Sequence, residues 1–233
     1  MKARPILMSA PMIRALLDGR KTQTRRVVKP QPLFSSCQQS FSTGLAAIAD
    51  AAFKKFVPDG CPYGQPGDLL WVRESLYRLG RWQQHEDETG ERESRWRAAE
   101  GICYHADQTE LPERNGFSWR SFPSIHMPRR ASRLTLELTE VRVERLQDIS
   151  DADAIAEGIE PVFTRAGQKC GWLDYQHEGD GMGYCTNPRE SYASLWESIN
   201  ARGSWELDPW VWCLSFRVHQ QNVDAFLATR RQP

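Results

Sequence analysis

The fold class is decided by the stretch Leu134-Thr135-Leu136-Glu137-Leu138-Thr139-Glu140-Val141-Arg142-Val143-Glu144-Arg145-Leu146. Apolar and polar residues alternate along it, which is the pattern of a β-strand with one buried face. We predict one long, bent strand that is exposed on its other face. Shorter strands are expected at residues 5–8, 24–28, 68–73 and 210–218. Because strands outnumber helices along most of the chain, the sequence predicts an α+β, β-rich protein.

Helices are predicted where capping residues precede an apolar periodicity. The expected helices are one after the cap Ser9 with Met12, Ile13, Leu16 and Leu17 on one face, residues 151–157 after Ser150, a helix opened by Asn187-Pro188, and a loosely attached helix after His219. Gly19 and Gly158 are expected to end the first two. Three further segments show no clear pattern. We predict an irregular segment at 33–62 with one helical turn near 45–56, a solvated excursion at 78–100, and a surface loop or lid at 164–186.

Composition narrows the class of protein. The 233 residues carry 30 Lys and Arg and 30 Asp and Glu, a balance that argues against coating of long nucleic acid by bulk electrostatics. No apolar run has the ~20 residues of a membrane span, and the N-terminus lacks a signal-peptide core, so a cytoplasmic location is expected. The six cysteines show no CxxC spacing and the five histidines are scattered. Free thiols, no metal site and no cofactor are therefore expected.

The first thirty residues depart from this balance, with eight Lys or Arg against the single acid Asp18. The densest part is Asp18-Gly19-Arg20-Lys21-Thr22-Gln23-Thr24-Arg25-Arg26, where the first helix ends and a strand begins. Cations beside small hydroxyls suit an anionic or nucleotide-like ligand. A solvated charged turn is the plainer interpretation of the same residues.

Four parts of the chain together resemble the ASCH domain family. They are the string Gly19-Arg20-Lys21-Thr22-x-Thr24-x-Arg26, the turn and strand Gly67-Asp68-Leu69-Leu70-Trp71-Val72, the capped helix with Glu157, and the last strand. The resemblance implies a PUA-like mixed β-barrel in a single domain over residues 1–218, with a tail at 219–233. Residues 31–62, 77–130 and 161–204 would be insertions into it. With Met127-Pro128-Arg129-Arg130-Ala131-Ser132-Arg133 before the alternating strand, the long form looks like ASCH proteins common in phages and prophages.

Some members of that family are bacterial N4-acetylcytidine amidohydrolases, and their working residues fall here on Lys21, Thr24 and Glu157. The resemblance implies that Thr24 is the nucleophile, Lys21 its base and Glu157 the acid for the leaving amine. The residue types suit acyl transfer, since burial and nearby cations lower the pKa of a lysine. A spacing of three places Lys21 and Thr24 on opposite faces of a strand, so they can converge only at a bulge or bend.

Four further residues are expected to bind the substrate: Arg20, Arg26, Glu74 and Trp71. Each also has a structural interpretation. Arg26 could pair with Glu74, and Trp71, like Trp210 and Trp212, could stack on a base or belong to the core. Arg129, Arg130 and Arg133 could bind a nucleic-acid backbone or only cover a sheet edge.

The sequence thus predicts a metal-independent amidohydrolase that acts on a modified nucleoside or on RNA. Two alternatives are a non-catalytic RNA- or nucleotide-binding module and a ribonuclease. Because the basic clusters are short in the sequence, weak salt dependence of ligand binding is expected, as for a pocket that takes one neutral nucleoside.

Overall fold

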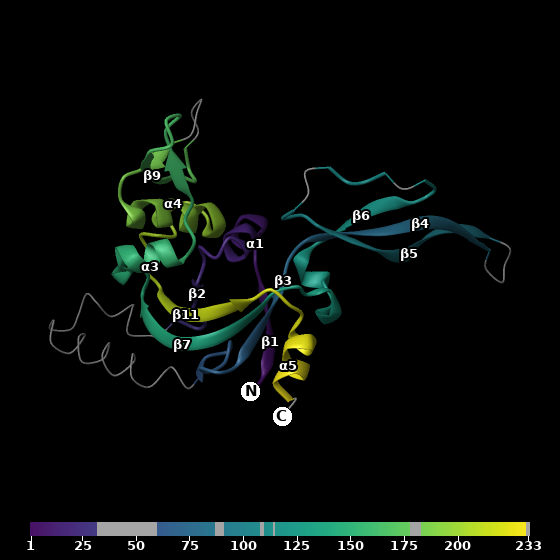
Figure 1. The fold of residues 1–233 in the computed structure, drawn as a ribbon, viewed down its shortest axis with the longest axis horizontal. Coiled ribbons are helices and arrows are strands. Elements are labelled where there is room, and N and C mark those ends of the chain that lie inside the picture. Colours follow the sequence, from purple (N-terminus) through teal and green to yellow (C-terminus); the bar gives the residue numbers. More distant parts are fainter. Residues whose placement is uncertain (32–59, 87–90, 108–109, 114, 178–182, 232–233) are drawn as a thin grey trace. The chain divides into compact units, whose positions relative to one another are not determined.

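The computed structural model describes residues 1–31, 60–86, 91–107, 110–113, 115–177 and 183–231 (Figure 1). These residues group into two compact units. The first comprises Met1–Arg4, Ala15–Leu70 and Leu136–His219, and the second comprises Pro5–Arg14, Trp71–Thr135 and Gln220–Pro233. A single domain over residues 1–218 stays a prediction, and the helical turn expected near 45–56 lies outside the described residues.

The five predicted strands do pair in one sheet, in the order β1-β3-β7-β11-β2. Their bounds are β1 Ala3–Leu7, β2 Gln23–Val27, β3 Leu69–Arg73, β7 Thr135–Arg145 and β11 Trp210–His219. In the described part of the chain β1 and β2 are the two edges of this sheet, so it does not close into a barrel. The α+β, strand-rich class is confirmed, whereas a closed barrel is not found among these residues.

The long alternating strand is present, but its exposed face was predicted wrongly over its first half. β7 lies between β3 and β11 in the sheet order, and Thr135 and Glu137 are buried together with the leucines between them. The Glu137 carboxylate is held 3.0 Å from Nε2 of His219. A central strand that is covered on both faces needs such partners for its polar side chains. Exposure begins only at Thr139 and Glu140, where the alternation changes phase.

The predicted helices all form, but the last one is not loosely attached, because its Val223 and Phe226 are buried. The helices are α1 Ala10–Leu17, α3 Asp151–Ala156, α4 Pro188–Asn200 and α5 Val223–Arg231, with short 3-10 turns at Ser124–His126, Arg129–Ala131 and Leu146–Asp148. The Ser150 hydroxyl accepts a hydrogen bond from the Asp153 amide at 3.1 Å, and the side chain of Asn187 accepts one from the Arg189 amide at 2.8 Å. Each bond satisfies a backbone donor that a helix start leaves free.

In the first unit, α3 and α4 cover an apolar core. Its buried members are Leu146, Ile149, Ala154, Ile159, Tyr192, Trp196 and Val211. The segment 164–186 was predicted to be a surface loop or lid, but it contributes two strands, β9 and β10, to a small sheet of order β10-β9-β8. The strands of this sheet are β8 Pro161–Phe163, β9 Lys169–Leu173 and β10 Tyr184–Cys185. Strands of two to five residues are too short to show a readable alternation.

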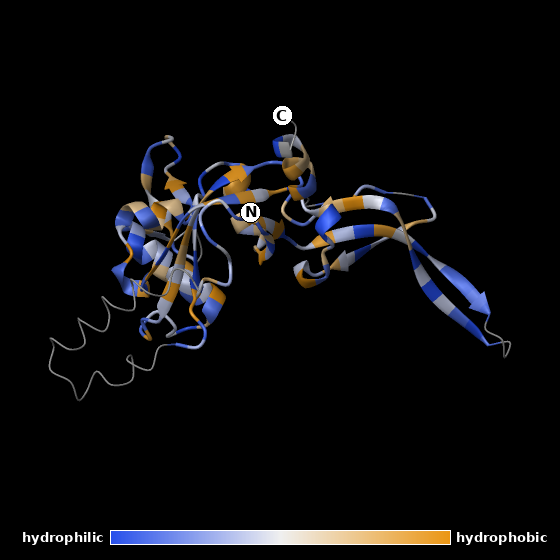
Figure 2. Ribbon diagram, turned by 90° about the horizontal axis from the view of Figure 1, so that it is seen from below, coloured by the Kyte–Doolittle hydropathy of each residue, from blue (hydrophilic) through white to orange (hydrophobic). Residues whose placement is uncertain are grey.

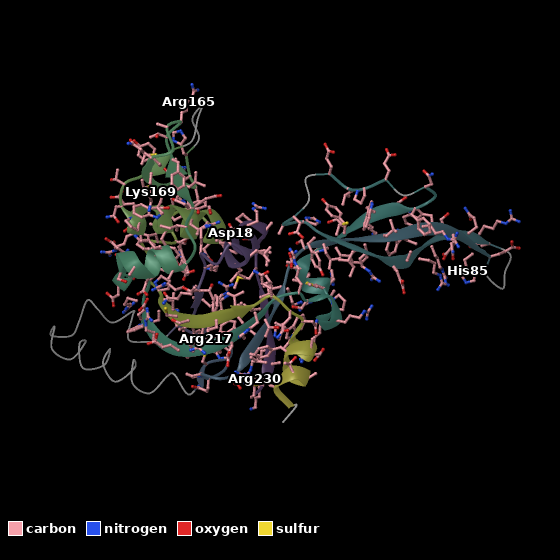
Figure 3. All side chains as sticks on the ribbon, in the orientation of Figure 1. Asp18, His85, Arg165, Lys169, Arg217 and Arg230 are labelled. Atoms are coloured by element: carbon pink, nitrogen blue, oxygen red, sulfur yellow. The ribbon has the colours of Figure 1, made fainter. Side chains whose placement is uncertain are left out.

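In the second unit, the predicted solvated excursion is instead a three-stranded antiparallel sheet of order β5-β4-β6. Its strands are β4 Leu76–Glu86, β5 Arg92–Tyr104 and β6 Ser118–Phe122. β6 pairs only with Leu76–Gly80, so β4 and β5 continue beyond it as a two-stranded ribbon. The ribbon is hydrophilic (Figure 2), and His85 lies near the end of β4 (Figure 3). Because both faces of these strands carry polar residues, the sequence shows no alternation of apolar and polar residues that would predict them.

No helix in the described chain is long and apolar enough to cross a membrane. The five cysteines that the structure describes are free thiols, and Cys213 is a fully buried core residue.

Gly158 provides a test of the packing between the ends of α1 and α3. A Cβ added at Gly158 would lie 2.8 Å from Lys21 Cβ and 3.0 Å from Ala15 Cβ, and its φ is +87°. Gly19 has a similar φ of +73° but open space around it. We expect Gly19→Ala to lower the free energy of unfolding by about 1–2 kcal/mol from backbone strain alone. Gly158→Ala should add an overpacking cost of about 1–3 kcal/mol, measured by urea denaturation. If both substitutions lower the free energy of unfolding equally, the close approach of Gly158 to Lys21 and Ala15 does not affect stability.

Candidate functional site

Lys21 is placed by the backbone around the end of α1. Beyond Gly19, the Lys21 amide donates to the Ala15 carbonyl at 3.0 Å, and the Thr22 amide donates to the Ala156 carbonyl of α3 at 2.9 Å. These two bonds tie the entry of β2 to the ends of two helices. The Lys21 side chain is thereby directed toward the end of α3.

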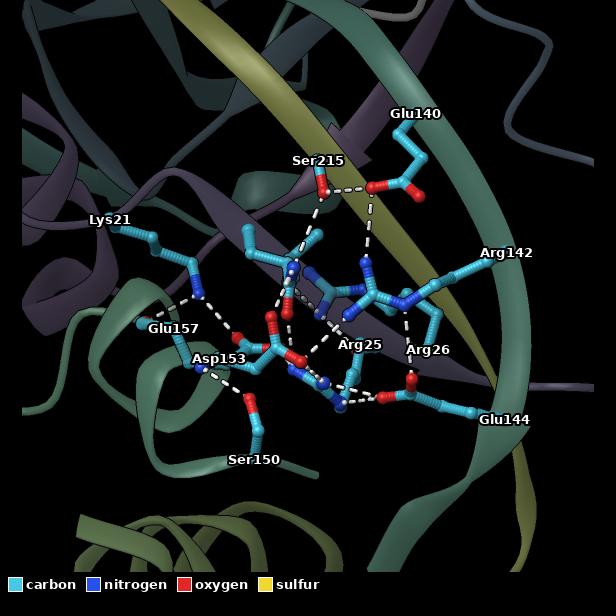
Figure 4. A network of polar contacts seen from close by, with 12 residues as sticks. Lys21, Arg25, Arg26, Glu140, Arg142, Glu144, Ser150, Asp153, Glu157 and Ser215 are labelled. Atoms are coloured by element: carbon cyan, nitrogen blue, oxygen red, sulfur yellow. Dashed lines mark hydrogen bonds and ion pairs between the residues drawn. The ribbon is translucent and has the colours of Figure 1, made fainter. Parts of the chain in front are cut away.

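The Lys21 ammonium and the Glu157 carboxylate form a buried pair (Figure 4). Lys21 Nζ donates to Glu157 Oε2 at 2.7 Å and to the Glu157 carbonyl at 2.7 Å. Lys21 is 0% exposed and Glu157 is 4% exposed. Burial lowers the pKa of Lys21, Glu157 raises it, and the charges of Arg26 and Arg25 lower it further, with a net lowering from the usual 10.5. A lysine that gives up its proton more readily is better suited to act as a base.

Arg25 extends this pair into a larger network. Its Nη1 donates to Glu157 Oε1 at 3.1 Å and to Gln23 Oε1 at 2.6 Å, and its Nε donates to Glu144 Oε1 at 2.9 Å. Arg25 is itself buried. Burial opposes its charge, but the carboxylates of Glu157 and Glu144 raise its pKa above the usual value.

Arg142 and Asp153 complete the network. Arg142 Nη2 donates to Asp153 Oδ2 at 2.8 Å, and Arg142 Nε donates to Glu144 Oε2 at 3.0 Å. Gln23 Nε2 bridges Asp153 Oδ1 at 3.0 Å and the Ser215 hydroxyl at 3.2 Å. We call the six charged residues the polar cluster: Lys21, Arg25, Arg142, Glu144, Asp153 and Glu157. Their positive and negative charges lie against one another, and Arg142 Nη1 also donates to Glu140 Oε2 at 3.1 Å.

Thr24 lies on the other face of β2. Residues two apart share a strand face, and the side chains follow this rule: Arg25 bonds Gln23, whereas Arg26 Nη1 donates to Thr24 Oγ1 at 2.9 Å. Thr24 is fully buried and pairs in register with Leu214 of β11. Within the described chain the Lys21 amine bonds Glu157 and not Thr24, so the bulge or bend that would bring Lys21 and Thr24 together is not seen here.

The other predicted site residues are divided between the two units. In the first unit, Arg20 bonds Asp18 Oδ2 at 2.9 Å and the Gly158 carbonyl at 2.9 Å. In the second unit, Glu74 is 2% exposed and accepts two bonds from Arg133, at 2.8 and 2.9 Å. Burial raises the pKa of Glu74, although Arg133 opposes this shift. Trp71 is 9% exposed; Trp210 and Trp212, in the first unit, are more deeply buried still.

Sequence reasoning overlooked three members of the polar cluster: Arg142, Glu144 and Asp153. It treated Arg25 only as a nearby cation. The available signal was the sequence Arg142-x-Glu144 on the polar side of the alternating strand, which pairs opposite charges two residues apart on one face. Nothing in the sequence indicates that Asp153, an ordinary first-turn helix acid, bonds this strand.

Searches of protein-family models, of curated proteins and of solved structures found no match to this chain. In the part of the chain that the structure describes, no three His, Cys, Asp or Glu side chains are grouped so that they could hold a metal ion. The chemistry of the site therefore has to be argued from its own residues.

The Lys21–Glu157 pair is expected to show strong energetic coupling. Lys21→Met and Glu157→Gln should each lower the free energy of unfolding by about 3–5 kcal/mol, because each leaves a buried charged group unpaired. The double variant should cost clearly less than their sum, since the second substitution removes the stranded group.

The exposed pair Arg92–Glu86, at 3.1 Å, is the control, and its coupling should be about 0–1 kcal/mol. All variants are compared by urea denaturation at one pH. Additive costs at Lys21 and Glu157 would contradict the burial and pairing described above.

Proposed function

We propose that this chain is a long, phage- or prophage-type member of the ASCH family with a PUA-like fold. In this proposal it is a metal-independent amidohydrolase that removes the acyl group from a modified nucleoside such as N4-acetylcytidine. The observation that carries the proposal is the buried Lys21–Glu157 pair, with its 2.7 Å contact and the lowered pKa of Lys21. A purely structural ion pair does not require an amine that loses its proton easily, whereas an acid–base pair does.

The pair holds one proton that can sit on either partner. With this proton on Glu157, the neutral Lys21 amine takes the hydroxyl proton of Thr24 as Thr24 Oγ1 attacks the acyl carbon. The C–N bond then breaks, and Glu157 gives its proton to the leaving exocyclic amine. Water attacks the acyl-threonine ester, its proton goes to Glu157, and the Lys21 ammonium returns a proton to Thr24. The products are cytidine and a carboxylic acid, and both side chains regain their starting protonation.

The proposal asks for one rearrangement. The Lys21 amine has to exchange a Glu157 contact for the Thr24 hydroxyl when substrate binds, because the two now lie on opposite faces of β2. β2 is an edge strand of the described sheet, so no further described strand is bonded along its outer side. Arg26 already bonds Thr24 Oγ1, and its charge stabilises the alkoxide that forms there. Arg20 keeps its proposed role in substrate binding, whereas the roles expected for Glu74 and Trp71, which belong to the second unit, stay predictions from the sequence.

Replacing the Thr24 hydroxyl is the direct test. Thr24→Val keeps the shape of the buried side chain and removes the nucleophile, so release of cytidine from N4-acetylcytidine should fall by at least about 10³-fold. Thr24→Ser keeps the hydroxyl and should retain a large part of the activity. Product is followed by chromatography, and thermal unfolding of both variants verifies that they fold. If Thr24→Val is as active as Thr24→Ser, Thr24 is not the nucleophile.

The pH profile tests the roles of the pair. The active pair carries one proton, so kcat/KM should fall with rising pH as that proton is lost, at an apparent pKa below 10.5 because the pKa of Lys21 is lowered. Arg26→Gln removes one of the charges that lower it, so this descending limb should move to higher pH. Arg20→Gln is the control and should leave the limb in place, since Arg20 is not among the groups that shift Lys21. If Arg26→Gln leaves the apparent pKa of the descending limb unchanged, the limb does not report the titration of Lys21.

A further inference from the structure

One face of the sheet β5-β4-β6 gathers arginines and aromatic rings from all three strands. Side chains directly opposite each other on paired strands share a face. The register pairs Leu76 with Phe122, Arg78 with Arg120, and Trp82 with Trp96. Because Leu76, Arg78 and Trp82 are separated by even numbers of residues along β4, these pairs fall on one side of the sheet. We call this side the arginine–aromatic face.

The pairing of Arg78 with Arg120 is unfavourable by itself. Like charges directly opposite each other on neighbouring strands destabilise a sheet. The Arg78 guanidinium lies over the Phe122 ring at 5.2 Å, and neither arginine has a carboxylate partner among the described residues. A bound anion would relieve this repulsion.

A third arginine borders the same region. Arg78 and Arg130 line a hollow of about 590 Å³, together with Leu76, Pro128 and residues 98–102 of β5, which include Glu100. The neighbouring arginines of this segment are already neutralised: Arg129 bonds Asp224 at 2.8 Å, and Arg133 bonds Glu74 and Asp107. Arg130 is exposed and has no carboxylate partner in the described chain. Of the basic segment 129–133, this is the residue that remains available to a ligand.

The aromatic rings supply the second component of a binding surface. Trp82 is 59% exposed, an unusual state for the largest apolar side chain. Its cross-strand partner Trp96 is half-buried and lies 5.7 Å from the Phe122 ring. An exposed ring on the same face as unpaired arginines suits a ligand that alternates flat bases with phosphates, because bases stack on aromatic rings and phosphates bind arginine.

We propose that the arginine–aromatic face binds single-stranded nucleic acid. Arg78, Arg120 and Arg130 hold successive phosphates, and an unpaired base stacks on Trp82. A duplex keeps its bases stacked inside and cannot use the tryptophan, so the surface favours a single strand. The inference does not depend on the amidohydrolase proposal, since every residue in it belongs to the second unit and none takes part in the proposed reaction.

The test uses the full chain and a fluorescein-labelled single-stranded RNA of about 12 nucleotides, a length within the site sizes of such surfaces. Binding is followed by fluorescence anisotropy over a series of salt concentrations. Arg120→Ala/Arg130→Ala should weaken binding about tenfold or more at low salt and lower the salt slope by ~1.4, or ~0.7 for each phosphate contact removed. Arg92→Ala/Arg95→Ala changes the net charge equally, but both of its arginines are bound to glutamates, so it should change binding little.

Trp82→Ala should weaken binding by about 5- to 150-fold without changing the salt slope, since it removes stacking and no charge. A duplex of the same sequence should bind more weakly than the single strand. The proposal is overturned if the two double variants lose affinity equally, if duplex binds as well as single strand, or if inorganic phosphate at matched ionic strength displaces the RNA completely. Thermal unfolding of each variant verifies that the sheet is intact.

Discussion

Compensation of buried charge is the constraint on which the candidate site depends. Lys21 and Arg25 are both withdrawn from water, and an unpaired charge in that position would cost several kcal/mol. Glu157, Glu144 and Asp153 supply the matching carboxylates from α3 and β7. Breaking one ion pair leaves a buried charge without its partner. The network therefore holds the end of α3, the start of β2 and the second half of β7 together.

The same compensation explains why Lys21 is separated from Thr24. A strand offers two faces, and the carboxylates lie on the face that Gln23 and Arg25 share. Lys21 joins them because Glu157 is there, which leaves Thr24 with Arg26 on the other side. Burial lowers the pKa of Lys21, and the contact with Glu157 opposes that shift while keeping the amine away from the proposed nucleophile. Any chemistry at this site must work with a base that is stabilised by its acid.

The arginines discussed above fall into two groups, those bonded to a carboxylate and those without one. Arg25, Arg133 and Arg142 are bound by carboxylates, which raise their pKa above the usual value and leave little charge to attract a ligand. Arg78, Arg120 and Arg130 have no such partner in the described chain, and two of them are directly opposed on neighbouring strands. A net charge of zero conceals this difference, because the sum counts neutralised and available charges alike.

Local chemistry in the sequence determined the five strands of the main sheet, the caps at Ser150 and Asn187, and the ends of helices at Gly19 and Gly158, because each depends on neighbouring residues. The strand-rich α+β class and the spacing argument for Lys21 and Thr24 followed from the same local patterns. Only the tertiary structure decided that β7 is covered on both faces and that residues 76–104 form paired strands. It also decided that Glu157 meets both Lys21 and Arg25, and that Arg78 lies opposite Arg120. These features depend on which distant segments pack together, and a single sequence does not encode that in any short-range pattern.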